Sequence, residues 1–205
     1  CQYHQSHYEC HSSKAQRWSP WLCAPRRQQV HLVQAGQLLA AREMADYWDA
    51  NFRTEDEPGR FCIWPGMPRA PWGAPFPLEI FHRDYDVTIY WEGYGMFRKI
   101  YMADHNPPEP ILHTAMGHSI AHWEDETLVV ETTHIAAGYF DHNGVPMSDQ
   151  IVTVERFMPT EDYSRLDYSL TTTDPVNFTE AFTLTRWFEW KPGDYVHPYE
   201  CLDRF

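Results

Sequence analysis

From about residue 77 to residue 190, apolar and polar side chains alternate, and this period of two constrains the fold more than any other feature of the sequence. Successive side chains of a strand point to opposite faces of its sheet, so alternation is typical of strands with one buried face. The pattern predicts strands near residues 77–82, 86–92, 96–102, 118–124, 126–134, 150–158, 163–172 and 178–190. We therefore predict a mainly β fold, an antiparallel meander that forms either a lipocalin-like barrel with room for a small ligand or a sandwich.

The part of the chain before the strands has a different pattern. Residues 1–30 mix polar residues without an apolar period, which predicts an irregular arm. Residues 31–48 carry an approximate helical stripe in good helix formers, which predicts one amphipathic helix. Repeated Pro and Gly from residue 58 to 77 predict an ordered, aromatic-rich loop. We expect a single structural domain, with the arm and helix in residues 1–57 and the β-barrel or sandwich in residues 58–205.

The charge of the chain argues against several classes of partner. It has 29 acidic and 16 basic side chains, a formal net charge of −13. Such a surface repels nucleic-acid phosphates and anionic lipids, so we expect neither as a partner. The apolar runs are much shorter than the roughly 20 residues of a membrane-spanning helix. The expected partner is a small molecule, with no membrane span, and the oligomeric state stays open.

The cysteines indicate an oxidising compartment. Four of them, Cys10, Cys23, Cys62 and Cys201, lack the CxxC spacing of zinc sites, which favours structural disulfides in one of three pairings. A bridge between Cys62 and Cys201 would close the longest loop and constrain the unfolded chain most, so we favour it. No basic, apolar leader is present and the chain starts at Cys1, as after processing. We expect a secreted or periplasmic protein, with a lipid-modified Cys1 as an alternative.

Several short motifs follow one another between residues 50 and 205. They are Cys62-x-x-Pro-Gly-x-Pro-Arg69, Pro77-Leu-Glu-Ile-Phe81, Gly117-His-Ser-Ile-x-x-Trp-Glu-x-x-Thr-Leu-Val-Val130, Gly144-Val-Pro-x-Ser148, Val154-Glu-Arg-Phe157, Thr173-Asp-Pro175 and Tyr199-Glu-Cys201. In this order they resemble a large group of uncharacterised secreted bacterial β-rich proteins. The resemblance implies export and a common β fold, and it implies no reaction. The chain departs from the group at Asp125-Glu126, where Gly-Asp is usual, and at Met147 and Val152, where histidine is usual, so chemistry through those histidines is not expected.

Three arginines fall on apolar strand faces when the alternation is read literally. Arg98 aligns with Ile100 and Met102, Arg156 with Val152 and Val154, and Arg186 with Phe182, Leu184 and Phe188. A guanidinium on a buried face needs a partner, because an unpaired charge in a low dielectric costs several kcal/mol. The partner is either an internal carboxylate, from Glu92, Glu131, Glu155 or Asp174, or a carboxylate or other oxyanion of a ligand, which the guanidinium fork fits bidentately.

Histidines are the candidates for proton transfer. His118 and His122 share a strand face but stand roughly 13 Å apart, too far to bind one metal ion. His118 is either a hydrogen-bonded structural histidine or a general acid or base, whose pKa Glu124 on the same face would raise if the fold brings it near. Asp141 and His142 form a turn with Gly144 and offer a second proton-transfer pair.

No cofactor is expected, since the chain lacks a GxSxG elbow, a phosphate-binding Gly-rich loop and a dinucleotide fingerprint. The exception is the arm, where Cys and His residues could bind copper or zinc, although a disulfide from Cys10 to Cys23 explains the same residues. The residues of this cluster are Cys1, His4, His7, Cys10 and His11.

Together these patterns predict an exported β-barrel-type protein that binds a small organic, acidic ligand. The pocket is expected to be lined by Arg98, Arg156, Arg186, Trp64, Trp72, Glu92 and Trp123. One alternative is a cofactor-independent lyase, hydratase or isomerase, in which His118 moves a proton and Arg98 or Arg156 stabilises negative charge. The other alternative is an accessory interaction protein with a filled barrel and an exposed apolar patch.

Overall fold

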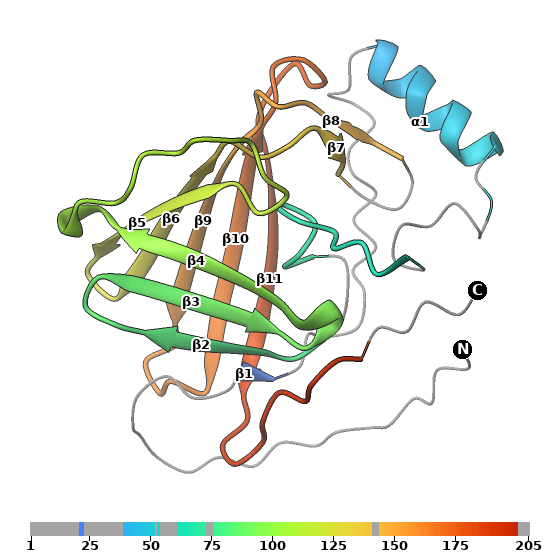
Figure 1. The fold of residues 1–205 in the computed structure, drawn as a ribbon. Coiled ribbons are helices and arrows are strands. Elements are labelled where there is room, and N and C mark those ends of the chain that lie inside the picture. The colour runs from blue at the N-terminus through green and yellow to red at the C-terminus, as the bar shows by residue number, and fades with distance from the viewer. Residues whose placement is uncertain are drawn as a thin grey trace.

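The computed structural model of the protein describes residues 21–22, 39–51, 53, 61–72, 76–140 and 144–200. Within these residues the chain forms a curled β-sheet with one helix beyond its upper edge (Figure 1). The predicted arm, apart from residues 21–22, lies outside the described residues, as does the expected start of the helix in residues 31–38. The mainly β fold with one helix is as predicted.

Eight long strands and one short strand close into a barrel. In spatial order they are β1 (Trp21–Leu22), β11 (Phe182–Trp190), β10 (Arg165–Thr173), β9 (Val152–Pro159), β6 (Thr127–Thr133), β5 (His118–Glu124), β4 (Met96–Met102), β3 (Asp86–Trp91) and β2 (Leu78–His82). The long strands form one continuous curled sheet, and β1 closes it by pairing with β11 on one side and β2 on the other. The eight long strands are the predicted ones. The last of them starts at Phe182 and not at residue 178 as predicted, because residues 179–180 form a bend.

The predicted antiparallel meander is wrong in two places. First, β4 and β5 pair in parallel, because residues 103–117 return across the sheet before β5 begins. This connection opens with a 3-10 turn, Ala103–His105. Second, β6 pairs with β9 instead of its next neighbour in sequence, and β7 (Gly138–Tyr139) and β8 (Pro146–Met147) form a separate two-stranded ribbon. Alternation reveals which side chains face inward, but it carries no information on strand direction or on the choice of partner.

The helix α1 (Leu39–Asn51) packs on the β7–β8 ribbon. Its Ala41 is buried, and the Trp48 ring lies 4.5 Å from the ring of Tyr139. Gly144, with φ +76, passes so close that a Cβ there would lie 2.1 Å from the indole of Trp48. The helix therefore docks through one narrow face, and it needs a glycine at this position of the ribbon.

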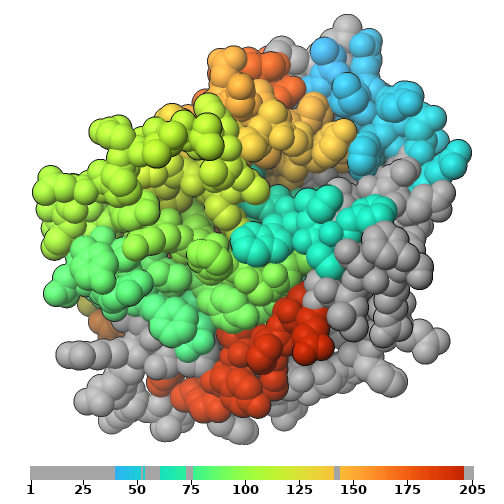
Figure 2. All heavy atoms as spheres, viewed as in Figure 1, coloured from blue at the N-terminus to red at the C-terminus, as the bar shows by residue number. Residues whose placement is uncertain are grey.

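The barrel interior is built from alternate residues of each strand. On β4, Met96, Arg98, Ile100 and Met102 are all buried, while the residues between them are partly or fully exposed. The loop that the Pro and Gly pattern predicted, described for residues 61–72, also contributes to this core, because Met67 and Ala70 are buried in it. In Figure 2 these loop residues (teal) lie next to the green part of this face of the molecule.

No helix among the described residues has both the length and the apolar character needed to cross a lipid bilayer.

Candidate functional site

The centre of the barrel holds a buried ion pair. Arg98 on β4 donates from Nη1 and Nη2 to the two carboxylate oxygens of Glu155 on β9, at 2.9 and 2.5 Å. Its Nε donates to Ser119 on β5 at 3.0 Å, and Nη2 also donates to Thr132 on β6 at 2.6 Å. Tyr168 on β10 donates its hydroxyl to Glu155 at 2.8 Å. Five strands thus each contribute one polar side chain to a single cluster.

This cluster decides between the two roles of Arg98. Arg98 faces inward as predicted, and its partner is an internal carboxylate, Glu155, which was one of the four candidates. Burial and the Glu155 carboxylate raise the pKa of Tyr168, so its hydroxyl stays protonated and can donate. With the carboxylate and two hydroxyls accepting from it, the guanidinium has no open edge for a ligand.

The prediction that Arg156 faces inward is wrong. On β9 the inward residues are Thr153, Glu155 and Phe157, so Arg156 lies on the outer face. There its Nη2 donates to Glu124 at 2.7 Å, and both side chains are well exposed. The hydrogen bonds from Arg156 and then from His122 lower the pKa of Glu124, which therefore stays ionised. Glu124 and Arg156 form a surface ion pair and do not contribute to the barrel interior.

His118 also lies on the outer face of the sheet, because its neighbour Ser119 faces inward. Its ring is 5.7 Å from that of Tyr101, and its Nε2 is buried without a hydrogen-bond partner among the described residues. Burial, and next the charge of His134, lower the pKa of His118. The prediction that Glu124 raises the pKa of His118 is therefore wrong, because Glu124 lies at the far end of β5 and pairs with Arg156.

The lyase alternative placed His118 beside Arg98 or Arg156. Arg98 lies on the opposite face of the sheet and is bound to Glu155, while Arg156 shares the outer face with His118 but pairs with Glu124 at the far end of β5. The second predicted proton-transfer pair, Asp141 and His142, lies outside the described residues.

Two predictions about cysteines and metals also fall largely on residues that are not described. The Cys and His cluster of residues 1–11 lies outside the described part. Cys62 is the only cysteine within it and is disulfide-bonded, while Cys201 is not described, so the pairing of these two stays a prediction. Across the described residues, no three His, Cys, Asp or Glu side chains are placed to hold a metal ion.

The remaining predicted ligand residues are spread over four places, of which three are described first. Trp64 packs edge-on against Phe97 on the outer face of β4, with ring centroids 6.1 Å apart. Glu92, which precedes the 3-10 turn Gly93–Gly95, accepts a hydrogen bond from the backbone amide of His197 at 3.0 Å and so fixes the C-terminal segment. Trp72 packs against the core beside Arg186, which faces the interior as predicted.

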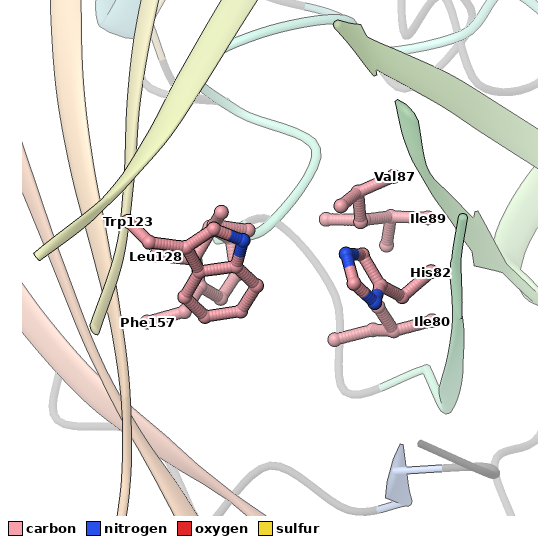
Figure 3. A pocket seen from close by; sticks show the side chains of 7 residues that line it. All are labelled: Ile80, His82, Val87, Ile89, Trp123, Leu128 and Phe157. Carbon is pink, nitrogen blue, oxygen red and sulfur yellow. The ribbon is translucent and has the colours of Figure 1, made fainter. Parts of the chain in front are cut away.

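Trp123 belongs to a hollow at one end of the barrel. Figure 3 shows its indole facing His82 across this hollow, and their ring centroids are 5.6 Å apart. The walls below these two exposed rings come from several strands and are buried apolar side chains: Ile80, Val87, Ile89, Leu128 and Phe157. The hollow measures about 290 Å³ with its open mouth included. Its enclosed part has room for about one water molecule.

The sequence reasoning missed His82, although a signal for it was present. Leu78 and Ile80 predict the inward face of their strand, and His82 continues that face to the strand end. A polar ring at the end of an inward-facing row is where a barrel mouth is expected.

Two of the motifs are joined by hydrogen bonds. Asp174 accepts from the Ser148 amide at 2.8 Å and the Ser148 hydroxyl at 2.7 Å, and also from Val176 and Asn177. Burial opposes ionisation of Asp174, but these hydrogen bonds outweigh it and lower its pKa. The Gly144–Ser148 and Thr173–Pro175 motifs thus have a structural role here.

Compared with known proteins, the chain matches no family model, no curated protein and no solved structure.

Proposed function

We propose that this protein binds a small apolar organic molecule at the open end of its barrel, between His82 and Trp123. The observation that carries the proposal is the hollow itself, whose buried walls are entirely apolar and whose mouth is formed by two exposed rings. Ligand sites in proteins are mostly apolar concavities with a few polar groups that fix orientation. His82 would supply the polar contact.

The hollow is small for a ligand, and its mouth can change shape. Its enclosed part, with room for about one water molecule, is far below the roughly 300–1,000 Å³ that is usual for ligand pockets, so a ligand has to widen the mouth in order to enter. His82 and Trp123 are exposed, so rotation of their side chains would enlarge the opening without disturbing the buried walls. The ligand class that fits is therefore a flat or slender apolar molecule with one polar group.

The proposed setting is the cell exterior or periplasm. It rests on the resemblance to secreted bacterial proteins and on the disulfide state of Cys62. A ligand-binding barrel in that setting would carry or sequester poorly soluble molecules. Fractionation of cells that make the protein from its full-length gene tests the setting independently of the ligand.

The binding experiment is a fluorescence titration with N-phenyl-1-naphthylamine, a neutral apolar dye. The wild-type protein should bind it saturably. Val87→Phe places a ring inside the hollow and should weaken binding about tenfold or more, since the phenyl group competes for the same space. The matched control is Val154→Phe, on the outer face of β9, which should leave binding unchanged.

A third variant guards against simple misfolding. Val87→Ala enlarges the hollow and should bind the dye at least as tightly as the wild type, although the fold loses stability. Equal loss of binding in Val87→Phe and Val154→Phe, or no saturable binding by the wild type, overturns the proposal.

A further inference from the structure

Arg186 differs from the other inward-facing arginine in its surroundings. It lies on β11 opposite Tyr168 of β10, and its side chain is largely buried. Its guanidinium carbon lies 4.9 Å from the ring centre of Phe188 and 5.5 Å from that of Trp72. Nη1 donates to the backbone carbonyl of Pro71. The loop of residues 61–72 therefore covers this arginine with one acceptor and one aromatic ring.

The guanidinium has no counter-charge among the described residues. Arg98 has the Glu155 carboxylate, whereas no described Asp or Glu lies within ion-pair distance of Arg186. Nε and Nη2, which form one edge of the guanidinium, have no hydrogen-bond acceptor in the described part of the chain. Neither nitrogen is fully enclosed, because neither is among the buried unsatisfied atoms.

The charge of Arg186 is thus poorly compensated. Burial lowers its pKa to about 10, with only a small opposing effect from Tyr168. Guanidinium groups stay protonated even so, and a buried charge without a partner is strongly unfavourable. An anion that reached this edge would gain a charge-assisted, two-point contact with two nitrogens that no described residue accepts from.

We propose that the Nε–Nη2 edge of Arg186 binds the carboxylate of a small monocarboxylic acid. A planar carboxylate matches two parallel N–H groups of the fork, one on each nitrogen. A single positive charge balances a monovalent anion, whereas a phosphate dianion would keep excess charge in an already acidic chain of formal net charge −13. The rings of Trp72 and Phe188 favour an acid with an apolar body.

This site is separate from the hollow at the barrel mouth. Arg186, Trp72 and Phe188 do not line that hollow, whose polar edge is His82. The benzoate experiment therefore tests the carboxylate site independently of the dye titration, which tests the hollow.

The test uses benzoate as the probe, with sodium chloride at matched ionic strength as the reference, at pH 7. Benzoate should raise the melting temperature of the wild-type protein in a saturable manner. Arg186→Met should abolish this response. Arg186→Lys keeps the charge but loses the fork, and should weaken benzoate binding by about tenfold or more in calorimetric titration.

The matched control is Arg165→Met on the adjacent strand β10. Arg165 also lies near a tryptophan ring, 6.0 Å from the centre of Trp187, but it has a carboxylate partner in Asp167. This variant should keep the full benzoate response. If Arg186→Met does not fold, the Arg186 Nε–H signal, identified by its absence in Arg186→Lys, should shift on adding benzoate to wild-type protein.

A wild-type response to benzoate that chloride reproduces overturns the proposal. So does a benzoate response that survives in Arg186→Met, or an Arg186 Nε–H signal whose chemical shift benzoate leaves unchanged. Inorganic phosphate at the same ionic strength should give no saturable response, and tighter binding of phosphate than of benzoate contradicts the monovalent site.

Discussion

The guanidinium of Arg98 binds the carboxylate of Glu155 through two parallel hydrogen bonds, with both side chains almost completely buried in the barrel. The two residues are 57 positions apart, and their strands are separated in the sheet by β5 and β6. This pair fills the middle of the barrel with polar groups, and the apolar hollow between His82 and Trp123 lies toward one end.

The first prediction concerns this pair. Arg98→Met leaves the Glu155 carboxylate buried without its cation, and should reduce the free energy of unfolding by about 3–5 kcal/mol. Arg156→Met removes only an exposed partner of Glu124 and should cost about 1 kcal/mol or less. Urea unfolding at pH 7 measures both, and equal effects of the two variants contradict the role given to the buried pair.

Replacing both Arg98 and Glu155 also tests whether the unpaired buried charge causes the loss of stability. Arg98→Met combined with Glu155→Leu removes both charges, so the double variant should be more stable than Arg98→Met alone.

The second prediction concerns the docking of α1. Gly144→Ala adds a Cβ at positive φ and directly against Trp48, so it should displace the helix and destabilise the protein. Gly193→Ala is the matched control, because Gly193 also has positive φ but a Cβ added there would meet no atom within 4 Å. The control should cost about 1 kcal/mol, from backbone strain alone. Hydrogen exchange of the α1 amides should accelerate in Gly144→Ala and stay unchanged in Gly193→Ala.

The third prediction concerns acid stability. The folded-state pKa of Asp174 is below its ordinary value, so its contribution is present above the unfolded pKa of about 3.9 and is lost as the pH falls through the folded pKa. Asp174→Asn should therefore lower the melting temperature at pH 7 and have a much smaller effect near pH 2. Asp46→Asn, on the exposed side of α1, is the control for the charge change. A constant difference between wild type and Asp174→Asn at all pH values would count against this role of Asp174.

The fourth prediction concerns His118. Because burial lowers its folded-state pKa, the unfolded chain binds the proton more readily. Stability from His118 is then complete above the unfolded pKa of about 6.5 and falls as the pH drops toward the folded pKa. His118→Gln should flatten the dependence of the unfolding free energy on pH between about 7 and 5. Urea unfolding at several pH values measures this slope, and an equal slope in the wild type and His118→Gln would contradict the role of His118.

The strands could be predicted from the sequence because each has to fill one side of the barrel, and alternation records that directly. The same reasoning failed on β9, where Val152 and Val154 make the outer face look apolar while Thr153 and Glu155 face inward. A strand whose inward face carries a buried ion pair reverses the usual polarity pattern, so the alternation alone assigned Arg156 to the wrong side.

The candidate site was less predictable than the fold. Arg98, Arg186 and Trp123 were expected to face a pocket, but the sequence cannot show which inward cation already has a carboxylate. That choice depends on strand order, and the parallel pairing of β4 with β5 brings Ser119 and Thr132 around Arg98. His82 was missed because an isolated histidine at a strand end carries no motif.

The most direct measurement of the central claim is methyl NMR of the protein saturated with N-phenyl-1-naphthylamine. We predict nuclear Overhauser contacts from the naphthyl protons to the methyl groups of Ile80, Val87 and Leu128, which line the hollow. Contacts confined to exposed methyl groups such as those of Ile111 and Leu112, with none to the hollow, would contradict it.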